Sequence, residues 1–106
     1  MLKVKNMVSA RSGRTVANQF DISRTNEAGV IGEYAFQSYD SLCASLKRTE
    51  SGLFKLTIYQ DGFYSRTTAK YLRAWLNDHI NPERVPDVLK AAKEAINAGA
   101  DMWEAE

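Results

Sequence analysis

Cysteine and histidine are almost absent from this chain of 106 residues, which contains one of each, Cys43 and His79. A single cysteine cannot form an internal disulfide, and Cys43 lies between apolar neighbours, where small buried thiols are common. One cysteine and one histidine also cannot supply the ligands of a structural zinc site. The carboxylates are scattered along the chain, without the alternating spacing of a calcium loop. We therefore expect no metal, no cofactor and a reducing, cytoplasmic compartment.

Residue patterns for catalysis are missing as well. His79 is expected at the end of a helix, where a cationic side chain is favourable for structural reasons alone. Nucleophilic catalysis needs a base beside the nucleophile, and no serine or cysteine lies in a recognisable elbow. Gly29 and Gly32 lack the context of a phosphate-binding loop. Two carboxylates could still meet in space as an acid and a base. We nevertheless predict no catalytic residues and a protein that is not an enzyme but binds a partner.

Long apolar runs and a large net charge are also lacking. Residues 1–6 do not resemble a signal peptide, and no segment approaches the roughly 20 apolar residues of a membrane span. The formal net charge of +1 gives no overall field toward nucleic acid or membrane. The hydrophobic content of 44% is that of an ordinary globular protein, and the length suits one domain. We expect a single domain over residues 1–106, located in the cytoplasm without a membrane partner.

Alternating apolar residues predict strands in the first half of the chain. The predicted strands cover about 2–9, 16–22, 33–38 and 54–59. In the first, Leu2, Val4 and Val8 are expected to face the core, and in the second, Val16, Phe20 and Ile22 share one face with Asn18. A turn at 11–14 should join these two strands as a hairpin, while 23–32 reads as a polar loop.

Helical spacing predicts three helices. A short one over 41–47 would be capped by Asp40 and bury Leu42, Cys43 and Leu46. A second, over 66–79, is capped by Ser65, and a third, over 85–98, follows Pro82 and ends at a glycine. The remaining tail would fray or dock through a tryptophan. The predicted fold class is α+β: a mainly antiparallel sheet of about four strands, a short middle helix and two C-terminal helices.

Charge is distributed unevenly along the chain. Residues 1–80 contain eleven Lys/Arg and seven Asp/Glu, whereas residues 81–106 contain three and six, so the body is about +4 and the acidic C-terminal helix and tail about −3. Arg66, Lys70 and Arg73 recur at helical spacing on the side opposite the apolar stripe. Together with Arg11 and Arg14 of the hairpin turn, they would form one basic surface if the two elements are neighbours. Such a surface either contacts phosphates or is a solvated helix face.

Two adjacent aromatic residues add to this candidate surface. Phe63 and Tyr64 lie between a predicted strand and a predicted helix, off the apolar phase, so we expect them to be exposed. Exposed aromatic side chains near arginines are effective interface anchors. The candidate binding residues are therefore Arg66, Lys70, Arg73, Phe63, Tyr64, Arg11 and Arg14.

Three segments carry a resemblance to a known family. Asn18-Gln19-Phe20, Phe36-Gln37-Ser38-Tyr39-Asp40-Ser41 and Tyr64-Ser65-Arg66-Thr67-Thr68-Ala69-Lys70-Tyr71 are similar to the motif series of an uncharacterised family of small bacteriophage and mobile-element proteins. The resemblance implies origin more than activity. It suggests a protein that occupies a surface of a host protein complex, such as an inhibitor of a bacterial defence complex of the anti-CRISPR kind. The alternative is a nucleic-acid-binding accessory protein that uses the basic helix face. The partner's identity and the oligomeric state are left open.

Overall fold

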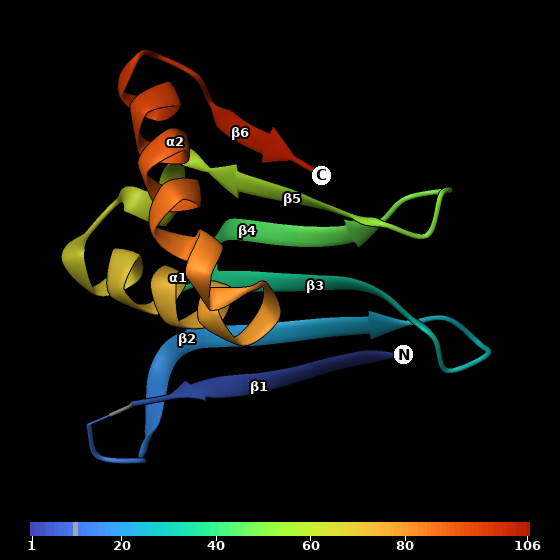
Figure 1. Cartoon of the computed structure of the whole chain (residues 1–106). Helices are drawn as coiled ribbons and strands as arrows, with labels where there is room; N and C mark the ends of the chain where they lie inside the picture. The colour runs from blue at the N-terminus through green and yellow to red at the C-terminus, as the bar shows by residue number, and fades with distance from the viewer. Residues whose placement is uncertain (10) are drawn as a thin grey trace.

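The computed structural model describes residues 1–9 and 11–106, and its central element is a six-stranded antiparallel sheet (Figure 1). The strands are β1 (Leu2–Val8), β2 (Thr15–Thr25), β3 (Ile31–Ser38), β4 (Ser41–Arg48), β5 (Phe54–Tyr59) and β6 (Met102–Ala105). Their order in the sheet equals their order in the chain, so that each strand pairs with its sequence neighbour. The chain therefore enters at one edge of the sheet and ends at the other.

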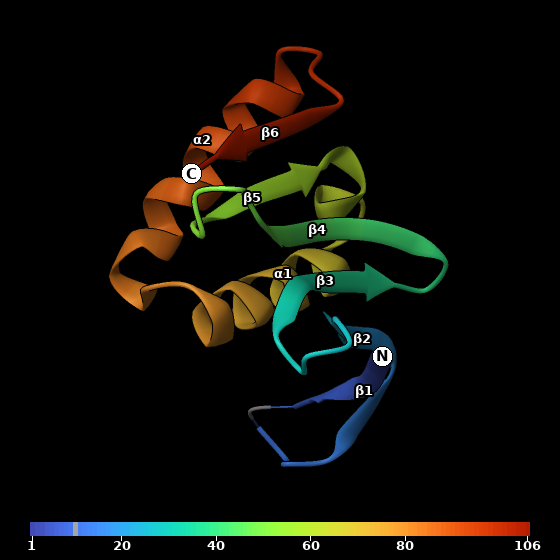
Figure 2. The ribbon, with the colours of Figure 1, turned by 90° about the vertical axis from the view of Figure 1, so that its right-hand side faces the viewer.

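Two helices cover one face of this sheet, α1 (Arg66–His79) and α2 (Val85–Asn97), as Figure 2 shows from the side. The 3-10 turns η1 (Gln60–Phe63) and η2 (Pro82–Arg84) precede them. Ser65 caps α1 as predicted, because its hydroxyl accepts a hydrogen bond from the backbone N–H of Thr68 at 3.1 Å. The predicted bounds of α1 are confirmed. The third predicted helix ends one residue earlier than expected, with Gly99 (φ +106°) just beyond it.

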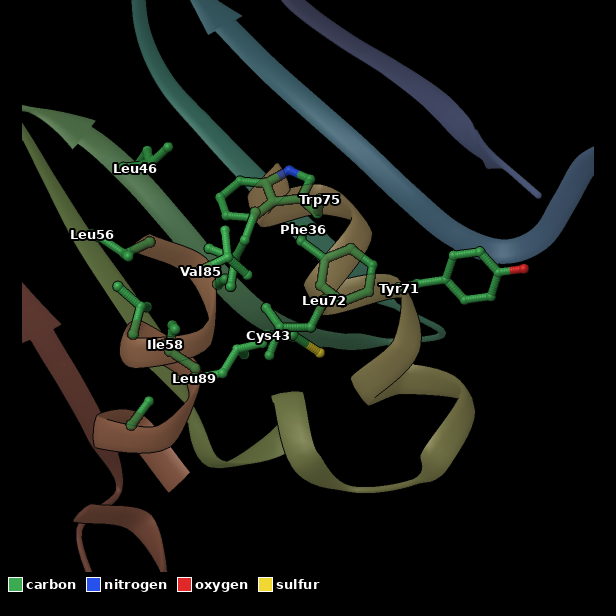
Figure 3. Packing of buried hydrophobic residues seen from close by; sticks show 14 of the residues in the cluster. Phe36, Cys43, Leu46, Leu56, Ile58, Tyr71, Leu72, Trp75, Val85 and Leu89 are labelled. Carbon is green, nitrogen blue, oxygen red and sulfur yellow. The ribbon is translucent and has the colours of Figure 1, made fainter. Parts of the chain in front are cut away.

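The core lies between the sheet and the two helices (Figure 3). Trp75 and Leu72 of α1 and Val85 of α2 are fully or almost fully buried against Phe36 and Ile58 of the sheet. The apolar stripe predicted for α1 is confirmed, since Tyr71, Leu72, Trp75 and Leu76 are all buried. Gly62 makes the close packing possible, because a Cβ there would lie 3.0 Å from Leu72 Cδ2.

The short middle helix predicted over 41–47 is wrong: these residues form the central strand β4, and Asp40 caps no helix. Four consecutive residues, 43–46, are buried, because β4 has strands on both sides and a covered face. A run of this kind does not distinguish a strand from a buried helix. Tyr39 and Asp40 form a two-residue turn between β3 and β4, and Tyr39 has a positive φ of 54°. Such turns normally carry glycine or asparagine, so the hairpin gave no sequence signal.

The sheet contains six strands instead of about four. β4 is one of the additional strands, and β6 is the other. β6 pairs with β5, with Ile58 opposite Trp103, so the tail is part of the sheet and docks through its tryptophan. The predicted loop 23–32 is also shorter, because β2 continues to Thr25 and β3 begins at Ile31.

The buried face of the first two strands differs from the prediction. In β1 the buried residue is Met7 (6% exposed), whereas Leu2, Val4 and Val8 are each more than half exposed. In β2 Gln19 and Asp21 are the buried side chains, not Phe20 and Ile22. The reason is that the helices cover the opposite side of the sheet from these apolar residues. Alternation in β3 and β5 predicts that Tyr34, Phe36, Phe54, Leu56 and Ile58 face inward. Phe36, Leu56 and Ile58 are buried, and Tyr34 and Phe54 are half-buried.

Candidate functional site

A groove of about 530 Å³ runs between α1 and α2, and all of its charged lining residues in the described part of the chain are cations. Arg66, Lys70 and Arg73 line it from α1, and Lys90 and Lys93 line it from α2. Its apolar lining consists of Phe63, Ala69, Pro86 and Leu89. Four of the seven residues predicted from the sequence, Arg66, Lys70, Arg73 and Phe63, thus lie together. We call this feature the basic groove.

Helix periodicity explains how the basic groove forms. Arg66, Lys70 and Arg73 follow the i, i+4, i+7 spacing that places side chains on one helix face. Pro86, Lys90 and Lys93 repeat this spacing on α2. The sequence prediction missed the two lysines because the net charge of residues 81–106 is negative. The i, i+4, i+7 spacing of residues 86, 90 and 93 is the signal that could have identified them.

The other predicted site residues lie outside the basic groove. Arg11 and Arg14 are exposed in the turn between β1 and β2 and are not among the residues that line it. Tyr64 is 84% exposed, as expected, but it lines a different hollow, with Asp40, Asp61 and several hydroxyl groups. The aromatic pair is therefore divided between two surfaces. Phe63, which was expected to be exposed, is half-buried against the core beside the cations, and Tyr64 lies on the acidic side of the start of α1.

A second cluster lies under α1, where His79 and Trp75 meet Asp21 of β2. Trp75 Nε1 donates a hydrogen bond to Asp21 Oδ1 at 3.0 Å, and His79 Nε2 lies 3.1 Å from both carboxylate oxygens. The His79 ring packs in a tilted arrangement against the rings of Tyr34 and Trp75, with centroid distances of 4.5 and 4.8 Å. His79 was expected to stabilise only its own helix end. Instead it connects α1 to a strand 58 residues away in sequence.

The charge of Asp21 is stabilised by this cluster. Burial by itself would raise the pKa of Asp21, but the hydrogen bonds from His79 and Trp75 and the nearby charges of His79 and Lys5 outweigh it. The pKa of Asp21 is therefore below its ordinary value of 3.8. An ionised carboxylate can only accept hydrogen bonds, so His79 Nε2 carries the proton that it donates to Asp21.

The lone thiol lies in the core. Burial raises the pKa of Cys43 to about 11, and the charge of Asp61 acts in the same direction. Hydrogen bonding to the backbone of Ser38 opposes this shift only in part. At neutral pH the group is thus a protonated thiol, not the thiolate that reacts as a nucleophile. Among the described residues, no group of three His, Cys, Asp or Glu side chains is arranged to hold a metal ion.

The three motif segments of the resemblance converge at one end of the sheet. The backbone N–H of Tyr39 donates to the carbonyl oxygen of Asn18 at 2.7 Å, and the hydroxyls of Ser38 and Thr68 lie 2.9 Å apart. Gln19 is paired with Ser38 across β2 and β3 and is 1% exposed, and its Oε1 has no hydrogen-bond partner among the described residues. The segments therefore join β2, the β3–β4 turn and the start of α1.

In the described part of the chain, no helix has the length and apolar character needed to cross a membrane.

No curated protein and no solved structure matches the chain. A family model does match: residues 2–90, from β1 to the middle of α2, fit that of a family of unknown function, DUF8033. The matched region contains Asp21, His79 and all of the basic groove except Lys93. Because the match covers most of the length of the chain, the chain belongs to the DUF8033 family.

Proposed function

We propose that this protein is a non-enzymatic binding protein that holds an acidic segment of a partner protein in the basic groove. The observation that carries the proposal is the gathering of five cations from two helices around an apolar floor. A lone basic helix face is usually only solvated. Two such faces opposite each other raise the local positive potential and attract negative charge.

The apolar floor favours a protein segment over a nucleic acid. The side chains of Phe63, Ala69 and Leu89 have no hydrogen-bond donors for a ligand, whereas phosphate groups are bound through many polar donors. An amphipathic segment satisfies both parts of the groove, since its apolar side chains cover the floor and its carboxylates meet the cations at the rim. The formal net charge of +1 is also small for a nucleic-acid-binding domain.

The resemblance to bacteriophage and mobile-element proteins supplies a biological setting. In that setting the partner is a host protein complex, and the protein acts as an inhibitor of a bacterial defence complex by occupying one of its surfaces. This step depends on the resemblance of the three motif segments rather than on a particular contact. Nucleic-acid binding through the same five cations is the competing function, and one experiment separates the two.

Charge reversal in the basic groove tests the proposal. Arg66, Lys70 and Arg73 are exposed, so changing all three to glutamate should leave the fold intact and weaken partner binding by at least about 100-fold, or 2.8 kcal/mol. The measurement is affinity purification of a tagged chain from nuclease-treated host lysate, followed by titration of the purified partner. Circular dichroism checks the fold.

The control changes Lys3, Arg24 and Lys47 to glutamate, which alters the net charge equally at exposed positions outside the groove. This control should bind the partner like the unmodified chain. A nuclease-resistant partner that binds both triple variants equally well would exclude the groove. Two results together would favour the nucleic-acid function. Nuclease treatment would remove all bound material, and the unmodified chain and the control would bind DNA or RNA in a salt-dependent way while the groove variant would not.

A further inference from the structure

A row of side chains crosses the helix-covered face of the sheet near the C-terminal end of α1, where Tyr34 contacts His79. The strand register places Lys3 beside Ser23, Ser23 beside Tyr34, Tyr34 beside Leu46, Leu46 beside Leu56 and Leu56 beside Ala105. The row therefore includes one residue from each strand. It is polar and cationic at the β1 edge, apolar in the middle and ends beside Glu106 at the opposite edge.

Two hollows lie above this row. The larger one, of about 380 Å³, has a floor of Tyr34, Leu46, Phe54 and Leu56, and Ile80 and Val88 belong to its lining. Its volume is within the range of small-molecule sites. The smaller one, of about 110 Å³, lies at the β1 end, where Lys3, Lys5 and Asp21 contribute to its lining. Tyr34 and His79 line both hollows, so they form the boundary between an apolar and a cationic compartment.

Cationic side chains line both hollows. Arg84 lines the larger hollow and is exposed, and Lys3 and Lys5 line the smaller one. The only carboxylate that lines the smaller hollow within the described residues, Asp21, is already engaged by His79, Trp75 and Lys5. Glu106 lies at the far edge, and with a strand spacing of about 4.8 Å the three steps from Tyr34 to Ala105 cover about 14 Å. The cationic end and Glu106 are thus well separated.

We propose that these two hollows form one binding site for an amphipathic anion, a small molecule with an unbranched or aromatic apolar body and a carboxylate head. The apolar body lies on Leu46, Leu56 and Phe54. The head lies beside Tyr34 and His79, between Arg84 and the two lysines. This site lies apart from the basic groove and does not depend on the function proposed for it.

Decanoate is a direct probe, compared with decanol and decyltrimethylammonium, which have the same chain and a neutral or a positive head. Isothermal titration calorimetry below micelle-forming concentrations should show one-to-one binding of decanoate with a Kd below about 1 mM. Decanol should bind at least about tenfold more weakly, and the cationic amphiphile more weakly still. Two-dimensional NMR should place the largest shifts at Tyr34, Leu56 and Ala105.

Two variants test separately how the carboxylate head and the apolar body of the ligand contribute to binding. The double variant Lys3→Glu, Arg84→Glu should weaken decanoate binding at least about tenfold, and Ala105→Trp, which fills the far end of the row, should abolish it. Arg24→Glu, Lys47→Glu is the charge-matched control, because both residues are exposed and line neither hollow. No saturable decanoate binding, equal affinity for the three heads or an equal effect of the two double variants would each overturn the proposal.

Discussion

Asp21 is the single residue that most connects the layers of this protein. Its carboxylate accepts hydrogen bonds from Trp75 and His79 of α1, and Lys5 of the neighbouring strand lies 3.8 Å away. A buried carboxylate costs free energy unless it is paired, and the cluster supplies these partners from another element. The same residue therefore links β1, β2 and α1.

Acid should weaken the folded state through Asp21. Because its pKa in the folded protein is below the ordinary value of 3.8, its stabilising contribution is present above that value and is lost as the pH falls further. Asp21→Asn should lower the free energy of unfolding at pH 7 by about 2 kcal/mol and make the dependence on acid pH shallower. Urea unfolding of both proteins between pH 2.5 and 7 measures this. Parallel pH profiles for the two proteins would show that Asp21 contributes no charge-dependent stability.

At the scale of elements, local pattern predicts the helices better than the sheet. α1 has a serine cap, α2 has Pro86 in its first turn and Gly99 just beyond its end, and both helices have apolar stripes. All of these signals act within a few residues. β4 has no such signal, because its run of buried residues is compatible with either structure and becomes a strand only through pairing with β3 and β5. The i, i+4, i+7 stripe of α1 predicted three of the five cations of the basic groove. The buried face of a strand depends on where the helices dock. The alternation of apolar and polar residues along the strand does not specify this.

The two faces of β1 give a test of this assignment. Changing Met7 to threonine should cost about 2 kcal/mol or more, since its side chain belongs to the core. Changing Val4 to threonine keeps a β-branched side chain at a position that is 53% exposed, so the free energy of unfolding should change by less than about 0.5 kcal/mol. Thermal and urea unfolding of both variants measure the difference. A larger loss at Val4 would mean that the opposite face of β1 is the buried one.

At the scale of the whole molecule, one layer of helices covers one face of a sheet whose two edges differ in charge. β1 carries Lys3 and Lys5, and β6 carries Glu104, which pairs with Lys55 of β5 at 3.0 Å. The acidic character predicted for residues 81–106 thus belongs mainly to the β6 edge and the outer side of α2, while Lys90 and Lys93 face the basic groove. Counting charges by segment could not separate these surfaces, because the residues of one helical segment lie on different faces of the helix.

The docking of β6 can be tested with two adjacent residues. Trp103 packs against the core, whereas Met102 points to the other side of the strand and is 41% exposed. Trp103→Ala should lower the free energy of unfolding by about 2 kcal/mol, and Met102→Ala by less than about 0.5 kcal/mol. Chemical denaturation measures both values. Equal values for the two variants would indicate that β6 adds pairing to the sheet without packing against its core.

The order of the strands has a consequence for how the chain folds. Because every strand from β1 to β5 pairs with its sequence neighbour, most of the sheet can assemble from successive hairpins with small loop-closure costs. Two junctions are different: Trp75 and His79 reach Asp21 across 54 and 58 residues, and Trp103 reaches Ile58 across 45. The first junction forms only when α1 docks on the sheet, and the second only after both helices have formed, so we expect the docking of the helical layer on the preformed strands to be the rate-limiting step of folding.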